Sequence, residues 1–296
     1  MPYFNIVAQT SENTVVTEYK QDKRRSVNYQ SEAELENEFI SMLCEQGYEH
    51  LHIHTEKDLI ANLRKKLEEL NSYSFSDAEW DDFFKNAVAN PNEHIAEKTR
   101  TIQEDNVKNL KRDNGETKNI TLIDKKNIHN NSLQVINQYV VGTENGAKHD
   151  NRYDVTVLVN GLPLVHIELK RRDSFWAGCG LYEYIQIFVI SNGTNTKYYS
   201  NSTRQNAEKE HKKRGASKTK TGNSFEFTCS WADANNRVIH DLIDFTKTFF
   251  AKHTILNVLT KYCVFTSENM LMVMRPYQIT ATERILNRIE IAHNYK

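Results

Sequence analysis

The first third of the chain carries apolar residues at three- and four-residue spacing, which is the period of an amphipathic helix. Ser31 can cap such a helix, so we expect one from Ser31 to about Gly47. A second helix is predicted over residues 58–70. A third begins at Ser76, where Ser-Asp-Ala-Glu has the spacing of a capping box, and ends at Asn90-Pro91.

From about residue 119 the pattern changes to short runs rich in Val, Ile, Leu and aromatic residues, separated by Asn and Gly. These runs predict the strands of one sheet: residues 120–124, 133–139, 153–160, 164–170 and 185–190. The last run is nearly all apolar, which is typical of a central strand covered on both faces. Helical spacing returns at 238–250 and 276–292. The expected fold class is therefore α/β, a central mixed β-sheet flanked by helices, with an N-terminal helical region.

Composition narrows the class of protein. The 296 residues are 39% hydrophobic, which is enough for a packed core. The net charge is −1, so a nucleic-acid surface would depend on how charges are arranged. The four cysteines form no CxxC pair, and the chain has neither a signal-peptide pattern nor an apolar run of ~20 residues. We expect a cytoplasmic protein without membrane contact.

Charged residues gather at the ends of two strands on either side of Asn160-Gly161, a pair typical of hairpin turns. Asp154 lies on the first strand, and Glu168 and Lys170 lie on the second. Residues two apart on a strand share a face, so Glu168 and Lys170 project together. If Asp154 joins them, two carboxylates offer the oxygen ligands that Mg²⁺ prefers, and the lysine can orient a bound water. This chemistry suits phosphodiester hydrolysis.

The hairpin itself allows a test of this idea. A regular two-residue turn at Asn160-Gly161 would pair Val159 with Leu162 and put Asp154 on the other face from Glu168. The metal-site hypothesis therefore predicts a loop with an odd number of residues, or a β-bulge. The alternative interpretation is that these residues form the solvated edge of an ordinary strand.

At these positions the sequence resembles a known family. Asp154 followed by Glu168-Leu169-Lys170 matches the PD-(D/E)xK nuclease motif, with Tyr153 in place of the proline. The surrounding sequence is similar to the N-terminal portion of the R subunit of type I restriction enzymes, and the resemblance covers nearly the whole chain. The stretches that carry this resemblance are SEAELENEFISMLCEQGYE, ITLIDKKN, NRYDVTVLVNGLPLVHIELK, FVISNGTNTKYYSN and VMRPYQITATERIL.

The resemblance implies roles for individual residues. Asp154 and Glu168 would ligate Mg²⁺, with the Leu169 carbonyl as a possible third ligand, and Lys170 would orient the attacking water. Related nucleases often add a helix carboxylate near the metal, for which Glu36 or Glu38 is the candidate in this sequence.

The resemblance also implies a domain organisation. Residues 1–260 would form an endonuclease domain, with a helical part at 31–104, the sheet core at 119–200, a basic loop at 205–221 and helices at 231–260. Residues 261–296 would begin a superfamily 2 helicase motor, in which Gln278 contacts adenine. The sequence has no GxxxxGK[ST] phosphate loop, so ATP binding is expected only in a longer, full-length subunit.

Two further segments carry expectations. The basic loop at 205–221 could contact DNA phosphates, although a solvated loop is the simpler interpretation. The family places a helix with a Q-x-x-x-Y motif directly after ExK, and this sequence has no such motif. We therefore expect that residues of this helix are missing from the sequence after Arg171 or Arg172, because the crossover from Lys170 to the strand near Ile185 normally needs a helix. The alternative is that this protein has lost the helix, which would argue against nuclease activity.

The predicted function is Mg²⁺-dependent endonucleolytic cleavage of double-stranded DNA, as the nuclease part of a type I site-specific deoxyribonuclease. The resemblance implies methylation and specificity subunits as partners. The alternative is a catalytically inactive docking module that attaches a DNA translocase to its methyltransferase partner.

Overall fold

The computed structural model describes residues 5–9, 14–18, 31–141, 151–169, 180–202 and 228–294. The basic loop at 205–221, Lys170 and the segment in which we expect a missing helix lie outside the described residues.

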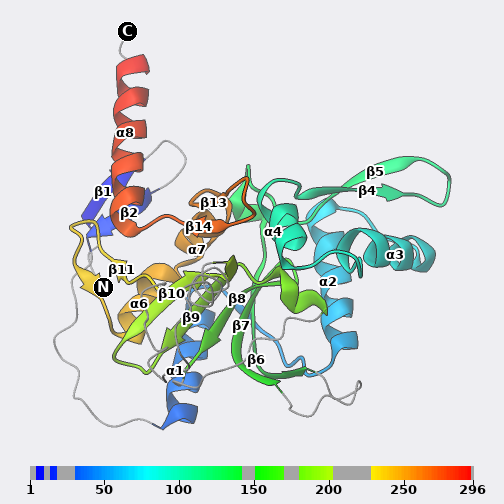
Figure 1. The fold of residues 1–296 in the computed structure, drawn as a ribbon, viewed down its shortest axis with the longest axis horizontal. Helices are drawn as coiled ribbons and strands as arrows, with labels where there is room; N and C mark the ends of the chain where they lie inside the picture. The colour runs from blue at the N-terminus through cyan, green and yellow to red at the C-terminus, as the bar shows by residue number, and fades with distance from the viewer. Residues whose placement is uncertain are drawn as a thin grey trace, which may run out of the picture.

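The core of the molecule is a six-stranded sheet in the order β10-β9-β8-β7-β6-β3 (Figure 1). Its strands are β3 (Glu49–His50), β6 (Leu133–Val141), β7 (Asn151–Val159), β8 (Leu162–Glu168), β9 (Ile187–Ser191) and β10 (Thr196–Ser200). The β3–β6 and β8–β9 pairs are parallel, and the other pairs are antiparallel. The sheet is therefore mixed, and β9 is an interior strand, as predicted.

The helices are α1 (Glu32–Glu45), α2 (Glu56–Asn71), α3 (Asp77–Phe83), α4 (Ile95–Gln103), α6 (Leu242–Phe249), α7 (Lys252–Thr260) and α8 (Pro276–Asn294). The described residues also form short turns: the π-helical η1 (Phe84–Val88) and the 3-10 turns η2 (Ile128–Asn130) and η3 (Gly180–Tyr184). Capping boxes begin α1 at Ser31 and α3 at Ser76, which confirms both predictions. Every helix within the described ranges is too short or too polar to cross a membrane.

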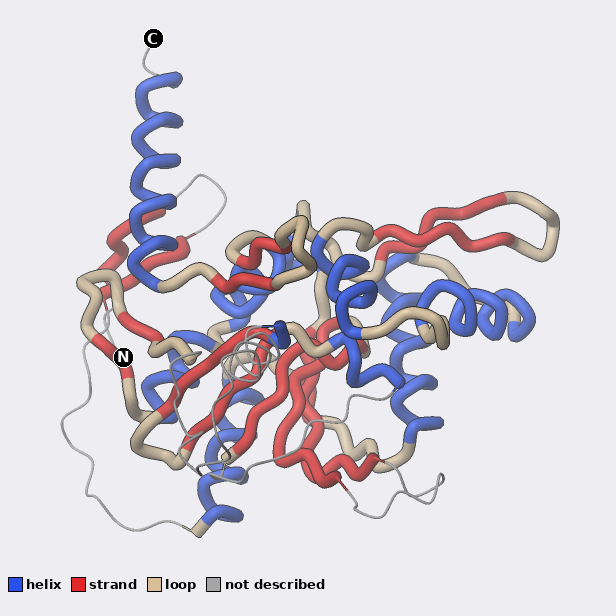
Figure 2. Tube along the Cα trace, viewed as in Figure 1, coloured by secondary structure: helices blue, strands red, loops and turns tan. Residues whose placement is uncertain are grey.

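Four two-stranded ribbons lie outside the central sheet (Figure 2). They are β1–β2 (Asn5–Gln9, Thr14–Glu18), β4–β5 (Val107–Lys111, Thr117–Thr121), β11–β12 (Trp231–Ala232, Val238–Ile239) and β13–β14 (Cys263–Phe265, Leu271–Val273). The prediction that residues 120–124 belong to the sheet is wrong, because β5 ends at Thr121 and pairs with β4. Only Leu110 and Ile120 are fully buried in this ribbon, so one apolar residue per strand could not support a central strand.

The C-terminal helices also differ from the prediction in one place. The helix expected over 238–250 begins only at Leu242, because Val238 and Ile239 form β12 and Asp241 caps the helix. The helix expected over 276–292 is α8, which projects from the body of the molecule (Figure 1). The domain boundary at residue 260 stays a prediction.

The two faces of the sheet meet different neighbours. Val155, Ile167, Val189 and Tyr198 are aligned across four strands, and the Tyr198 ring lies 5.2 Å from that of Phe249. Helix α6 therefore covers this face. Alternation places the side chains of Asp154, Thr156, His166 and Glu168 on the opposite face, where Thr156 lies 3.4 Å from the hydroxyl of Tyr182 in η3. The observed architecture is the expected α/β fold.

Candidate active site

The turn between β7 and β8 is a tight two-residue turn at Asn160-Gly161. Their φ angles of +51° and +84° are those of the mirror-image turns that suit a hairpin. The Asn160 side chain is buried, donates to the Leu122 carbonyl (3.0 Å) and accepts from the Ser132 amide (2.8 Å). The turn is thus fixed from both of its residues.

A bulge follows the turn in β8. Val159 pairs with Leu162 and Leu158 pairs with Pro163, but Val157 pairs with Val165, which leaves Leu164 as the extra residue. Proline is tolerated at position 163 because it has no amide hydrogen to donate, and the bulge already interrupts the hydrogen bonds between the strands there. The sequence-based prediction of a bulge is confirmed.

The bulge shifts the pairing register of the β7–β8 hairpin by one residue. Beyond it, Thr156 pairs with His166 and Val155 with Ile167, so the register continued by one residue places Asp154 opposite Glu168. Directly opposed residues share a face and have neighbouring side chains. The hairpin therefore brings the two predicted carboxylates together.

Asp154 is held at the end of β7. Its Oδ2 accepts a hydrogen bond from the Leu169 amide at 3.0 Å, which ties the end of β7 to the residue after Glu168. Burial raises the pKa of the Asp154 carboxyl, and the negative charges of Glu168 and Glu32 raise it further against the opposing effects of the Leu169 amide and His166. A bound cation would favour the ionised form.

Glu168 is 8% exposed and contacts a second buried side chain on its own strand. Its Oε2 lies 3.0 Å from Nε2 of His166, while Nδ1 of His166 lies 3.1 Å from the Val155 carbonyl. The His166 ring also meets the ring of Phe188 edge to face, with centroids 6.1 Å apart. Among the described contacts, the hydrogen bond of Glu168 with His166 uses Oε2.

The donor set suits a small divalent cation. Asp154 and Glu168 supply hard carboxylate oxygens from opposed positions, and Mg²⁺ is commonly held by one or two protein carboxylates plus water. Within the described ranges, no group of three or more His, Cys, Asp or Glu side chains is arranged to enclose a metal ion. The two carboxylates fit a Mg²⁺ site whose coordination is completed by water and substrate oxygens.

The predicted roles of the two other site residues, Leu169 and Lys170, are not tested by the described contacts. Lys170 lies outside the described residues. Leu169 is 4% exposed and donates its amide to Asp154. The roles of the Leu169 carbonyl as a ligand and of Lys170 in orienting water stay predictions.

The acidic residues of α1 approach the sheet differently from one another. Glu36 accepts hydrogen bonds from Asn137 (2.7 Å) and Gln138 of β6, so the described contacts hold it at that strand. Glu38 points about 200° around the helix axis from Glu36. The charge of Glu32, one turn before Glu36, acts on Asp154. These contacts place Glu36 at β6, where the register sets Gln138 opposite Asp154, and a part for Glu36 or Glu38 at the metal stays a prediction.

Gln278 lies at the beginning of α8. Its Oε1 accepts a hydrogen bond from the backbone amide of Arg275 at 2.8 Å, which is the contact that the third helical residue makes with the capping residue in a capping box. In this structure the side chain therefore helps to start the helix, and adenine contact stays a prediction.

Sequence reasoning gave little weight to two residues of this site. Alternation within HIE already places His166 and Glu168 on one face. Glu32 lies in the first turn of α1, and the capping box at Ser31 accounts for the start of this helix without assigning Glu32 a function. Only the packing of α1 against the sheet reveals its relation to Asp154.

Comparison with known proteins gives consistent results. The family model described as type I restriction enzyme R protein N terminus matches residues 29–207. The chain is 43% identical to the type I restriction enzyme EcoprrI endonuclease subunit of Escherichia coli, over 96% of this chain and 90% of that protein. It is 34% identical to the SsaAORF53P endonuclease subunit of Staphylococcus saprophyticus and 32% identical to the SauMSSORF170P endonuclease subunit of Staphylococcus aureus. Each staphylococcal match covers 88% of this chain and 27% of the relative, so the chain spans about a quarter of those proteins.

Proposed function

The chain belongs to the type I restriction enzyme R protein family, as its N-terminal portion, and on this premise we propose that the β7–β8 hairpin is the metal-dependent nuclease centre of a type I restriction endonuclease. The observation that carries the proposal is the bulge at Leu164, which aligns Asp154 with Glu168. A bulge in a buried hairpin interrupts the ladder, and here it converts two separated carboxylates into a pair.

Each residue has a defined part in this proposal. Asp154 and Glu168 hold a divalent cation, which lowers the pKa of a bound water and offsets the charge that develops on the phosphate. Lys170 orients the attacking water. The substrate is double-stranded DNA, and the cutting enzyme is a full-length subunit that binds ATP and assembles with methylation and specificity subunits.

The test is cleavage of plasmid DNA by the assembled enzyme carrying Asp154→Ala, Glu168→Ala or Lys170→Ala. Loss of a metal ligand removes several kcal/mol of transition-state stabilisation, so we expect cleavage to fall by about a thousandfold or more. ATP hydrolysis should persist, because these residues belong to the hairpin and not to a nucleotide site.

Matched controls come from the β4–β5 ribbon, where Asp113 and Lys111 are exposed. Asp113→Ala and Lys111→Ala should cut DNA at the normal rate. If all three hairpin variants also cut normally, the nuclease assignment is wrong and the docking-module alternative gains support.

A further inference from the structure

His166 stands between a backbone carbonyl and the carboxylate of Glu168. It is 4% exposed, with Nδ1 at 3.1 Å from the Val155 oxygen and Nε2 at 3.0 Å from Oε2 of Glu168. A carbonyl oxygen can only accept, so Nδ1 carries the hydrogen of the first contact. The orientation of the ring is thereby fixed from the neighbouring strand.

The second contact joins Nε2 of the same ring to Oε2 of Glu168 at 3.0 Å. This hydrogen bond holds one oxygen of the Glu168 carboxylate. Phe188 packs edge to face with the imidazole, which limits the movement of the ring. Rotation of the Glu168 carboxylate is therefore restrained by the hydrogen bond at Oε2.

We propose that His166 is a positioning residue of the metal site, which holds Oε2 of Glu168 so that Oε1 is presented to the divalent cation. The inference rests on the proposed function, because it assigns His166 a part in the same site. Hydrogen-bond partners of metal-ligating carboxylates typically change metal affinity or activity by 10- to 100-fold when they are removed.

Two substitutions separate the contacts of the ring. In His166→Asn the side-chain amide reaches about as far as Nδ1, so it can still donate to Val155 but not to Glu168. In His166→Gln the amide reaches about as far as Nε2, so the contact with Glu168 is kept. Both variants carry the same uncharged amide group, so their comparison isolates the contact with Glu168.

The measurement is calorimetric titration of the 296-residue chain with Mn²⁺, accompanied by thermal unfolding without metal. We expect His166→Asn to bind Mn²⁺ about 10- to 100-fold more weakly than the unchanged chain and His166→Gln to recover most of the affinity. His253→Gln, on α7 where the histidine contacts Asn257, is the control and should bind Mn²⁺ normally.

The outcomes distinguish the two proposals. If His166→Gln and His166→Asn bind Mn²⁺ equally, or if both match the unchanged chain, His166 does not position Glu168. If the unchanged chain binds no Mn²⁺, or if binding survives the Asp154→Ala and Glu168→Ala substitutions together, the proposed metal site fails and the role of His166 fails with it. If a variant shows no thermal unfolding transition, the same substitution is assayed in the assembled enzyme by Mg²⁺-dependent DNA cleavage. Equal Mg²⁺ requirements for His166→Asn and His166→Gln in that assay overturn the inference.

Discussion

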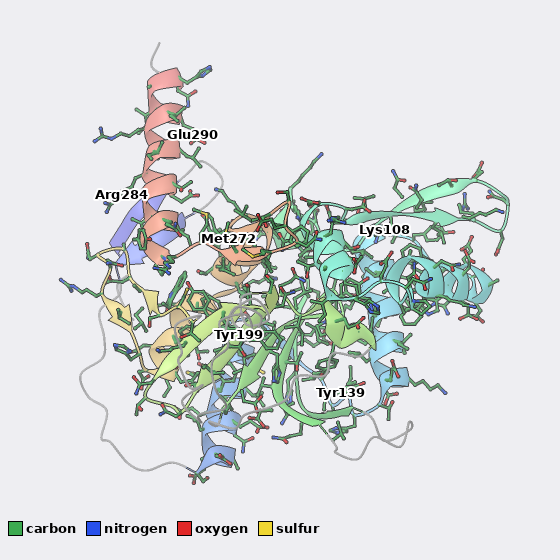
Figure 3. The ribbon with its side chains drawn as sticks, viewed as in Figure 1. Lys108, Tyr139, Tyr199, Met272, Arg284 and Glu290 are labelled. Carbon is green, nitrogen blue, oxygen red and sulfur yellow. The ribbon has the colours of Figure 1, made fainter. Side chains whose placement is uncertain are left out.

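Two hairpins of this molecule turn at the same dipeptide and differ in almost everything else. The β4–β5 ribbon turns through Asn114-Gly115, keeps an unbroken register and projects from the body of the molecule, where Lys108 marks it in Figure 3. The β7–β8 hairpin turns at Asn160-Gly161, carries a bulge and lies in the middle of the sheet.

The charges of the two hairpins show what the difference means. In the β4–β5 ribbon, Lys108 pairs with Asp105 and Arg112 with Glu116, with each acidic partner well exposed. In the β7–β8 hairpin, Asp154 and Glu168 are brought together with their surroundings partly withdrawn from water. Exposed ion pairs change the free energy of unfolding little. Two carboxylates that lie together away from water lower the stability of the fold unless a cation binds between them. The second arrangement is the kind that a functional site requires.

The largest contrast is expected at the turn glycines. Both have a left-handed φ, +84° at Gly161 and +82° at Gly115, so alanine is strained at either position by about 1 kcal/mol. A Cβ at Gly161 would lie 2.6 Å from the Cα of Leu63 in α2, whereas a Cβ at Gly115 meets no atom within 4 Å. We expect Gly161→Ala to lower the free energy of unfolding by about 3 kcal/mol or more and Gly115→Ala by about 1 kcal/mol. Urea unfolding measures both, and equal losses would mean that α2 does not pack closely on the β7–β8 turn.

A smaller contrast is expected at the turn asparagines. Asn160 is buried and bonds Leu122, Asn131 and Ser132, whereas the Asn114 side chain bonds only Glu116 at the surface, as far as the described contacts go. Removing Asn160 leaves buried partners unsatisfied, so Asn160→Ala should cost about 2 to 3 kcal/mol. Asn114→Ala should cost less than about 1 kcal/mol. Thermal unfolding of the two variants provides the comparison, and a cost at Asn160 no larger than that at Asn114 would contradict the buried network.

The smallest contrast has opposite signs at Asp154 of the β7–β8 hairpin and at Glu79 of α3, which accepts a hydrogen bond from the β4–β5 turn. Burial raises the pKa of Asp154 above its ordinary value of 3.8, so the metal-free chain loses stability as pH rises and this group ionises. The Tyr73 hydroxyl, with the amide of Asp113 in the β4–β5 turn, lowers the pKa of Glu79. The ionised form of Glu79 therefore stabilises the fold above its ordinary pKa, and this contribution is lost as pH falls through the lowered value.

Isosteric amides test these signs. At pH 7 without metal, Asp154→Asn should raise the melting temperature and Glu79→Gln should lower it. The Asp154→Asn difference should narrow as pH falls through the raised pKa and this carboxyl becomes protonated. The Glu79→Gln difference should begin to narrow only below about the ordinary pKa of 4.5, as pH falls towards the lowered value. Melting curves between pH 4 and pH 7 decide the matter, and a lower melting temperature for Asp154→Asn at pH 7 would show that the site is not strained in the absence of a cation.

Local sequence determined much of the fold. The capping boxes at Ser31 and Ser76 specified where α1 and α3 begin, since the groups that satisfy each other lie within three residues. The apolar runs of β7, β8 and β9 identified interior strands by composition. Parity along the hairpin even required a bulge, because face alternation is fixed by residue count.

Other features depended on tertiary packing. The run at 120–124 has the composition of a strand, but its pairing with β4 outside the central sheet follows from which neighbours were available. The acidic residues of α1 show the same dependence: the helix period gives their spacing, but only the docking of α1 on β6 decides that Glu36 meets Asn137 and that the negative charge of Glu32 raises the pKa of Asp154. Likewise, HIE put His166 beside Glu168 on one face, while the Val155 carbonyl that fixes the ring comes from the neighbouring strand. The sequence by itself determined which residues could share a face, because backbone geometry is local, and the tertiary structure decided which of them meet, because contacts between distant segments depend on how whole elements pack.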